Sequence, residues 1–309
     1  METVLSRPRR CYGPVGLLTL LLLPAASGQA QRATPPGDLE GTLARASARV
    51  EDYLTRAQSL VCTETVHVQP LGAGLTGDGF GRTIESELRL SWDGDGEGES
   101  AGEARTRRQV MKVNGHPPRK KDRNNCTGPE QHVTEPQPLS LLLASERDDY
   151  AFSWAGLGKV DKRDAFMIDF RQVEKVRVDV RLLEGTEDCV SYDLTGGMRG
   201  RLWIDAETAD VLRLDQRLAG QVEVRLPEAL ARKPGVSPVW TLERWDTSMR
   251  FKRVTFDEPQ ELLVLPVSTT TLRVTQGSGT PRQRTTTTYS RYKRFLTGGR
   301  LVPSQAAPR

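Results

Sequence analysis

The sequence contains few of the residues from which active sites and metal sites are usually built. Its 309 residues include four Cys and three His, and no Cys-x-x-Cys pair occurs, which argues against a zinc or thioredoxin-like site. The sequence also has no Ser-centred nucleophile elbow, Walker loop or dinucleotide-binding fingerprint. Because the common signatures of metalloenzymes, hydrolases and dehydrogenases are absent, we predict no cofactor and no metal.

Apolar runs long enough to cross a membrane are also lacking. The apolar stretch at 15–26 has 12 residues, too few for a hydrocarbon core of about 30 Å. Arginines precede this stretch and the small residues Ala26, Ser27 and Gly28 end it, which is the order of a secretory signal peptide. We therefore predict an exported protein that is periplasmic or envelope-associated and not membrane-spanning, cleaved after Gly28 or, nearly as favourably, after Ala30.

Neither sign of charge dominates the chain. Lys and Arg number 44 against 40 Asp and Glu, for a net charge of +4. The one dense basic run, 119–123, lies in a loop rich in Pro, Asn and Gly and has no interleaved aromatics. A solvated loop is favoured over a nucleic-acid patch, so no nucleic-acid partner is predicted.

Three cysteines remain after the predicted cleavage: Cys62, Cys126 and Cys189. In an oxidising compartment we expect a disulfide between two of them. The sequence leaves all three pairings open, and the odd count leaves at least one thiol unpaired.

The clearest structural pattern is a hairpin at 188–218. Leu202 and Ile204 alternate with polar or amphipathic neighbours, and after a corner rich in turn formers Leu212 and Leu214 do the same. Such alternation is typical of half-buried strands with one apolar face. We expect the Asp205 carboxylate to close the corner by accepting backbone N–H groups two or three residues later.

The rest of the body reads as further strands with few helices. An amphipathic helix is predicted at 39–59 behind the cap residue Asp38, and a short helix at 139–145. Strands are predicted at 60–69, 82–92, 105–113, 150–154, 164–170, 175–183, 189–194, 221–226, 240–256, 261–276 and 282–295.

Scarce helices leave little room for parallel crossovers between these strands. We predict a mainly β fold: a single large, curved antiparallel sheet, or half-barrel, of about eleven strands with one long and one short helix on its concave side. A closed β-barrel is the alternative. The predicted organisation is a signal peptide at 1–28, a linker at 29–37, a half-barrel domain at 38–296 containing a long mobile loop at 116–137, and a flexible tail at 297–309.

Four short motifs resemble the bacterial lipoprotein-carrier half-barrel superfamily, which includes lipoprotein-sorting proteins and envelope-stress sensors, and in particular its exported, uncharacterised branch. They are Val-Cys-Thr-Glu at 61–64, Val-Asn-Gly at 113–115, Gly-Arg-Leu-Trp-Ile-Asp at 200–205 and Leu-Pro at 265–266. Relatives usually have Gly at the corner after the third motif, where this chain has Ala209 and Asp210. The resemblance implies a hydrophobic cavity between sheet and helix.

From this resemblance we predict a non-enzymatic envelope protein that binds the acyl chain of a lipid or lipoprotein. The bulkiest residues of the strands before the hairpin are the candidates for lining the cavity: Trp92, Phe152, Trp154, Phe166, Ile168 and Phe170. The first alternative is an interaction or sensory module whose core is filled by its own side chains. A remote one is a cysteine hydrolase using Cys126 and His132.

The first predicted strand carries an acidic residue among its apolar ones. Glu64 falls on the apolar side of the first predicted strand and would need a partner such as arginine if it were buried. The sequence alone favours an acid at a strand edge that reaches water. The oligomeric state is not predicted.

Overall fold

The computed structural model describes residues 38–56, 60–92, 104–123, 139–182, 189–257 and 260–294. All of them belong to the second of the two units into which the chain divides, Thr34–Arg309. The predicted signal peptide, linker and tail lie outside the described residues, as does the 124–137 part of the predicted loop.

Thirteen strands are found within the described residues. They are β1 (Leu60–Pro70), β2 (Arg82–Trp92), β3 (Ala104–Val113), β4 (Tyr150–Val160), β5 (Arg163–Gln172), β6 (Arg177–Leu182), β7 (Val190–Thr195), β8 (Met198–Asp205), β9 (Val211–Leu218), β10 (Val222–Arg225), β11 (Val239–Phe256), β12 (Glu261–Gln276) and β13 (Arg282–Arg294). Each matches a strand predicted from alternation, with ends that differ by a few residues. The largest difference is β4, which continues six residues past the predicted end at Trp154.

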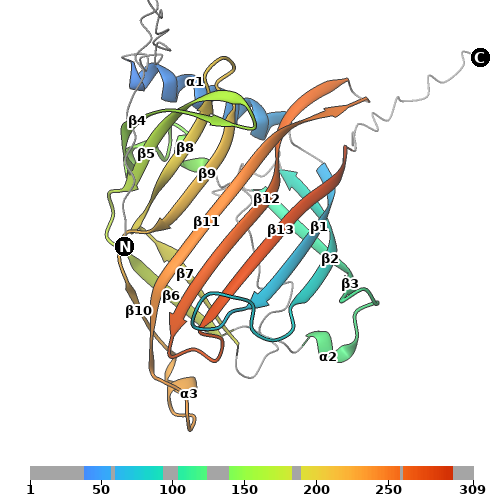
Figure 1. Ribbon diagram of the computed structural model, residues 1–309, viewed down its shortest axis with the longest axis vertical. Coiled ribbons are helices and arrows are strands. Elements are labelled where there is room, and N and C mark those ends of the chain that lie inside the picture. Colours follow the sequence, from blue (N-terminus) through green and yellow to red (C-terminus); the bar gives the residue numbers. More distant parts are fainter. Residues whose placement is uncertain are drawn as a thin grey trace, which may run out of the picture. The chain divides into compact units, whose positions relative to one another are not determined.

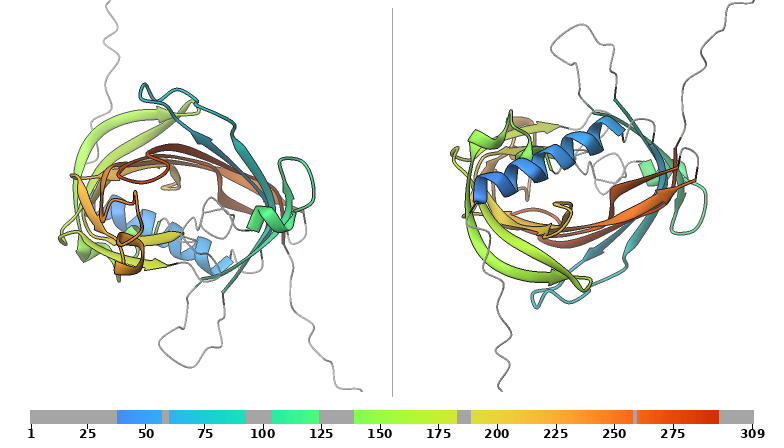
Figure 2. Two further views of the ribbon diagram at one scale, coloured as in Figure 1. Left: turned by 90° about the horizontal axis from the view of Figure 1, so that it is seen from below. Right: turned by 90° about the horizontal axis from the view of Figure 1, so that it is seen from above.

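Eleven of these strands form one curved antiparallel sheet (Figures 1 and 2). Its order is β3-β2-β1-β13-β12-β11-β9-β8-β5-β4, with β10 pairing with β11 off this path. Strands β3 and β4 are unpaired edges, so the sheet is open. The half-barrel prediction is confirmed, and the closed barrel is wrong.

β6 and β7 form a separate two-stranded sheet, although their alternation resembles that of the other strands. Tyr192 of β7 packs on Trp245 of β11 with ring centroids 6.0 Å apart, and Val178 and Val180 of β6 join the same apolar cluster. Alternation predicts that a strand has an apolar face, but it does not predict which strand pairs with it.

The corner between β8 and β9 is built as the sequence predicts. Oδ1 of Asp205 accepts hydrogen bonds from the backbone N–H groups of Glu207 (3.1 Å) and Thr208 (2.8 Å). Ala209 has φ +59°, the left-handed conformation that favours Gly. This corner places Asp210 at the end of the hairpin.

The long helix is α1 (Leu39–Arg56). Its first turn is capped by Asp38, whose Oδ1 accepts a 2.8 Å hydrogen bond from the N–H of Gly41. Figure 2 shows α1 lying across one end of the curved sheet. Its face of Leu43, Ala46 and Val50 is at most 3% exposed and turns toward the concave side.

The predicted short helix is a 3-10 turn, η2 (Ser140–Leu142), whose Leu141 and Leu142 are buried against α1. A second 3-10 turn follows it, and two four-residue helical turns lie elsewhere in loops. They are η3 (Arg147–Asp149), α2 (Lys120–Arg123) and α3 (Glu228–Ala231).

One row of paired residues shows how the concave face is filled, because directly opposite side chains on neighbouring strands point to the same side of a sheet. The row runs from β5 to β2 as Ile168, Leu202, Leu214, Met249, Thr269, Thr287, Val66 and Ile84. All eight side chains are buried. The first four pack with α1, so the whole row faces the concave side.

Two regions of this face differ in chemistry. The α1 cluster comprises Leu43, Ala46 and Val50 with the apolar residues of β5, β8, β9 and β11 that pack on them. The Glu64 cluster comprises polar side chains of β1, β2, β3, β12 and β13 that are buried or nearly so: Glu64, Ser86, Arg108, Thr269 and Thr287.

Candidate functional site

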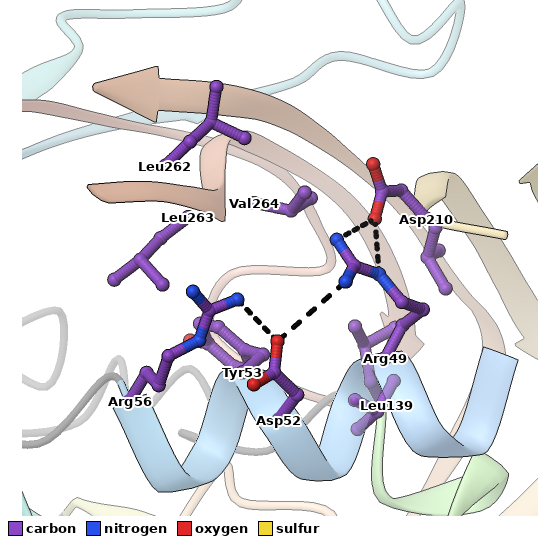
Figure 3. A pocket seen from close by; sticks show the side chains of 11 residues that line it. Arg49, Asp52, Tyr53, Arg56, Leu139, Asp210, Leu262, Leu263 and Val264 are labelled. Atoms are coloured by element: carbon purple, nitrogen blue, oxygen red, sulfur yellow. Dashed lines mark hydrogen bonds and ion pairs between the residues drawn. The ribbon is translucent and has the colours of Figure 1, made fainter. Parts of the chain in front are cut away.

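A cleft opens where α1 meets β12 and the end of the β8–β9 hairpin (Figure 3). It encloses about 370 Å³ of empty space, including space open to solvent. Because that figure includes open solvent, the site is an open cleft and not an enclosed cavity. The lining residues are Arg49, Val50, Asp52, Tyr53, Arg56, Leu139, Asp210, Val211, Leu262, Leu263 and Val264.

One wall of the cleft is charged and centres on Asp210, whose side chain is only 2% exposed. Its Oδ1 accepts a 3.0 Å hydrogen bond from Nε of Arg49 on α1. Its Oδ2 accepts hydrogen bonds from Nη2 (2.8 Å) and Nε (3.1 Å) of Arg253 on β11. The hydroxyl of Thr208 also donates to Oδ2 at 2.9 Å, so one carboxylate joins helix, hairpin and sheet.

The surroundings of Asp210 determine its protonation. Burial by itself would raise the pKa of this carboxyl, but hydrogen bonds from Arg253, Thr208 and Arg49 outweigh burial and hold the pKa below its usual range. The group is therefore ionised at neutral pH.

The helical side of the cleft carries a second ionic group. Asp52 forms an ion pair with Arg56 one turn later, and its carboxylate lies 3.7 Å from Nη1 of Arg49. Next to them, Tyr53 packs against the apolar cluster that contains Leu263 and Leu265. Burial, with Cys62 and Tyr289 close by, raises the pKa of its hydroxyl above the usual range, so Tyr53 stays neutral.

The opposite wall is apolar. Leu263 of β12 points toward the charged helix side, and its neighbours Leu262 and Val264 also line the cleft (Figure 3). Leu262 is 40% exposed, whereas Leu263 is 1% exposed. Successive side chains of a strand point to opposite faces, so Leu263 is the buried apolar side chain of this wall and Leu262 lies at its exposed side. The cleft therefore joins apolar residues of β12 to charged residues of α1, and as a whole it is amphipathic.

None of the six aromatic and aliphatic residues predicted to line a cavity lines this cleft. Ile168 and Phe170 are buried in the α1 cluster, and Phe152 and Trp154 pack against it partly buried. Phe166 is also buried. Trp92 ends β2, and its side chain lies outside the part of the chain that is described.

Rings of these predicted residues contact one another and neighbouring aromatic side chains. The rings of Trp154 and Phe166 meet edge to face with centroids 5.7 Å apart, and Tyr150 meets Phe170 in the same way at 6.0 Å. The indole N–H of Trp154 is buried without a hydrogen-bond partner. The structure therefore brings Phe152, Trp154 and their neighbours together as packed core beneath α1.

The expectation that Glu64 reaches water is wrong. Its side chain is fully buried, and Arg108 of β3 binds it through two hydrogen bonds, Nε–Oε2 at 2.5 Å and Nη2–Oε1 at 3.0 Å. Arg108, which lies 44 residues further along the chain, is therefore the arginine partner that a buried Glu64 was predicted to need. Ser86, its cross-strand neighbour, has a buried hydroxyl without a partner.

The cysteines separate into two kinds. Cys62 is buried and free, and burial with the adjacent Glu64 raises its pKa to about 12, so its thiol is protonated at neutral pH. Cys189 is disulfide-bonded. Pairings that include Cys62 are thus not made. Cys126 and His132, the residues of the hydrolase alternative, lie outside the described residues.

Among the described residues, no group of three His, Cys, Asp or Glu could hold a metal ion. The same part of the chain contains no helix that is both long enough and apolar enough to cross a membrane.

Sequence reasoning missed the charged wall of the cleft. Asp210 reads as one of several turn residues, and Arg49 as part of the polar face of α1. They are 161 residues apart, and neither belongs to a motif. The pairing depends on how α1 crosses the sheet, for which no local sequence signal exists.

The fold and the cleft define the class of this protein: a half-barrel of antiparallel strands with a helix across one end and an amphipathic cleft beside the helix. No protein-family model matches the chain, and no curated protein matches it.

Solved structures share the outline of this fold. A domain described as an outer membrane lipoprotein-sorting protein from Vibrio parahaemolyticus aligns over 84% of this chain and 94% of its own, with 10% identity and a TM-score of 0.38. A LolA superfamily protein from Nitrosomonas europaea aligns over 82% and 94%, with 8% identity and a TM-score of 0.36. A DUF1329 family protein from Desulfovibrio piger aligns over 83% and 93%, with 10% identity and a TM-score of 0.37. At these values the likeness concerns the fold alone.

Proposed function

We propose that this chain is a non-enzymatic envelope protein that binds the acyl chain of a lipid or of a lipidated protein. The observation that carries the proposal is the amphipathic cleft, because its apolar wall is continuous with the apolar interior. Leu139 and Val211 line the cleft and also belong to the α1 cluster, and Val264 packs against that cluster.

A methylene chain laid along this wall would pass from solvent toward Leu139, Val211 and Val264, which contact the buried α1 cluster. Each buried methylene contributes about 0.8 kcal/mol. Eight would contribute about 6 kcal/mol before the costs of association. The cleft is open to solvent, so a bound chain would have to extend either over the surface or into the α1 cluster.

The residues predicted from sequence keep a place in this proposal. Phe152, Trp154, Ile168 and Phe170 form the deeper part of the apolar region, with α1 packed on them. A bound chain would reach them only by displacing side chains of α1 such as Leu43. We therefore propose the cleft as the entry and these four as the deeper lining.

A second candidate is an interaction module with a self-filled core. It is favoured by the complete burial of Ile168 and Phe170 by their own neighbours. In this case the unpaired edges β3 and β4 would be the working surfaces, since an exposed strand edge can pair with a partner's strand.

The two candidates are separated by lipid binding. Native mass spectrometry of the purified exported protein would show co-purified lipid, and tryptophan fluorescence would be titrated with palmitate and a palmitoylated peptide. We expect saturable binding. The absence of both signals would remove the acyl-binding proposal and favour the interaction module.

A pair of matched variants locates the site. Leu262 lines the cleft and is 40% exposed, whereas Leu182 on β6 is 42% exposed outside it. Leu262→Ser should weaken palmitate binding about tenfold, because burial of a Leu side chain is lost, and Leu182→Ser should leave it unchanged. Equal effects would place the site elsewhere.

A further inference from the structure

We propose that the cleft recognises one negative charge, so that its ligand is a monoanionic amphiphile with a carboxylate or phosphodiester head. This inference rests on the proposed acyl binding and adds the chemistry of the headgroup. It is argued from the charge balance of the cleft and from one arginine N–H that lacks a partner.

The ionic groups in and behind the cleft do not balance. Three arginines face two aspartates: Arg49, Asp52, Arg56, Asp210 and Arg253. Hydrogen bonds from its neighbours hold Asp210 in the ionised form. One positive charge therefore remains without a counter-charge among these groups, whose arginine side chains are 36–39% exposed.

The distribution of contacts assigns the excess charge to the Arg56 end of the cleft. Asp210 is committed to Arg49 and Arg253, with four N–O distances of 2.8–3.1 Å. Asp52 is the only carboxylate of this group that pairs with Arg56, and it also lies 3.7 Å from Nη1 of Arg49. Arg56 therefore shares a carboxylate.

Arg56 also has an unused donor. Its contact with Asp52 is made through Nη2, whereas its Nε is buried and has no hydrogen-bond partner. Leaving a buried donor of a charged group unpaired is costly, and an anionic oxygen is the partner that satisfies it best. A headgroup oxygen bound at Nε would satisfy the donor and balance the charge together.

The position of Arg56 fits an amphiphile. Figure 3 shows its guanidinium between α1 and the apolar wall, close to Leu263. A head held there would direct its tail along Leu263 and Val264 toward Val211. A dianion would instead leave one negative charge in excess near Asp52, which favours a monoanion.

The experiment compares ligands that differ in the head. Isothermal titration calorimetry at pH 8 would measure decanoate, which is ionised, against 1-decanol, which is neutral. We expect decanoate to bind about tenfold more tightly. Short-chain phosphatidylglycerol against phosphatidylcholine then shows whether the phosphodiester or the carboxylate is the better head.

Two arginine variants assign the preference to Arg56. Arg56→Gln should bind decanoate and decanol equally, and Arg56→Lys should keep part of the preference. Arg232→Gln is the matched control, because Arg232 forms the same kind of i,i+4 ion pair with Glu228 on α3, away from the cleft. This control should keep the full preference.

The outcomes separate this inference from the function on which it rests. Equal binding of decanoate and decanol to the unmodified protein, or an undiminished preference in Arg56→Gln, would overturn the headgroup inference and leave acyl binding intact. Binding of neither ligand would overturn both. Thermal unfolding of each variant shows whether α1 is still docked.

Discussion

The α1 cluster and the Glu64 cluster lie on the same concave face of one sheet, yet they are filled in opposite ways. In the α1 cluster, Leu43 and Ala46 of the helix cover apolar strand residues. In the Glu64 cluster, a fully buried carboxylate is neutralised by Arg108, beside the buried hydroxyls of Ser86 and Thr269 that have no partner. Apolar packing is non-directional, whereas a buried charge needs one specific partner.

The comparison shows that alternation predicts which side chains of a strand share a face. It does not predict whether that face is stabilised by apolar packing or by a buried ion pair. Glu64 stands in the same alternating series of β1 as Cys62 and Val66, and the pattern buries all three. The α1 cluster is stabilised by many apolar contacts, each of which another apolar side chain could make. The Glu64 cluster depends on one ion pair, for which Arg108 is the specific partner. The two regions should therefore respond differently to substitution.

The largest effect is expected in the Glu64 cluster. Arg108→Ala leaves Glu64 buried without its partner and should lower the free energy of unfolding by about 4 kcal/mol, measured by urea denaturation. Arg89→Ala is the matched control, because Arg89 pairs with Glu87 but its side chain is 58% exposed. It should cost no more than about 1 kcal/mol.

Replacing both Glu64 and Arg108 tests whether the loss comes from the unpaired charge. Glu64→Leu combined with Arg108→Leu should recover most of the loss, since apolar residues can replace a buried ion pair at little cost. Similar losses for Arg108→Ala and Arg89→Ala would mean that the Glu64 cluster is accessible to water, and the contrast with the α1 cluster would disappear.

A somewhat smaller effect is expected in the α1 cluster. Leu43 is fully buried there, so Leu43→Ala should cost about 3 kcal/mol through lost burial and a residual cavity. Leu54 lies on the same helix and is only partly buried against the cluster. Leu54→Ala should cost about 1 kcal/mol, as measured by urea denaturation. A larger loss at Leu54 would show that α1 is docked through its C-terminal end instead.

The smallest effect concerns Asp210, whose carboxylate joins α1 and β11 at the end of the β8–β9 hairpin. The pKa of Asp210 is held below its usual range in the folded protein, and in the unfolded chain it is about 3.9. Its contribution to stability is therefore present above about pH 4 and is lost as the pH falls through the folded value. The difference in Tm between wild type and Asp210→Asn should shrink by a few degrees from pH 6 to pH 3.

The control for this pH dependence is Asp164→Asn. Asp164 forms an ion pair with Lys159, but its side chain is 72% exposed. The Tm difference from wild type should stay small at every pH. A constant difference for Asp210→Asn as well would show that the ionisation of Asp210 does not hold α1 to the hairpin.

Strand positions were predictable because the physical cause is local. Every strand of the main sheet shows an alternating or β-branched pattern, and the Asp205 corner closes with the hydrogen bonds that its side-chain length allows. The predicted end of β4 at Trp154 is wrong, because the strand continues through Gly156 and Gly158 to Val160. Gly156 has φ +109° at a bulge between β4 and β5, where glycine marks an irregular strand and not its end.

The sequence by itself determined the elements of this protein: its strands, its amphipathic helix, their antiparallel arrangement and the requirement that a buried Glu64 find a cation. Only the tertiary structure decided that Glu64 is buried, that Arg108 is the cation, and that Asp210 joins Arg49 and Arg253 beside a cleft. Alternation and capping act over a few residues, so a local pattern can encode them. Ion pairs between residues 43 to 161 positions apart depend on the curvature of the sheet and the crossing of α1, which arise only once all the strands are in place.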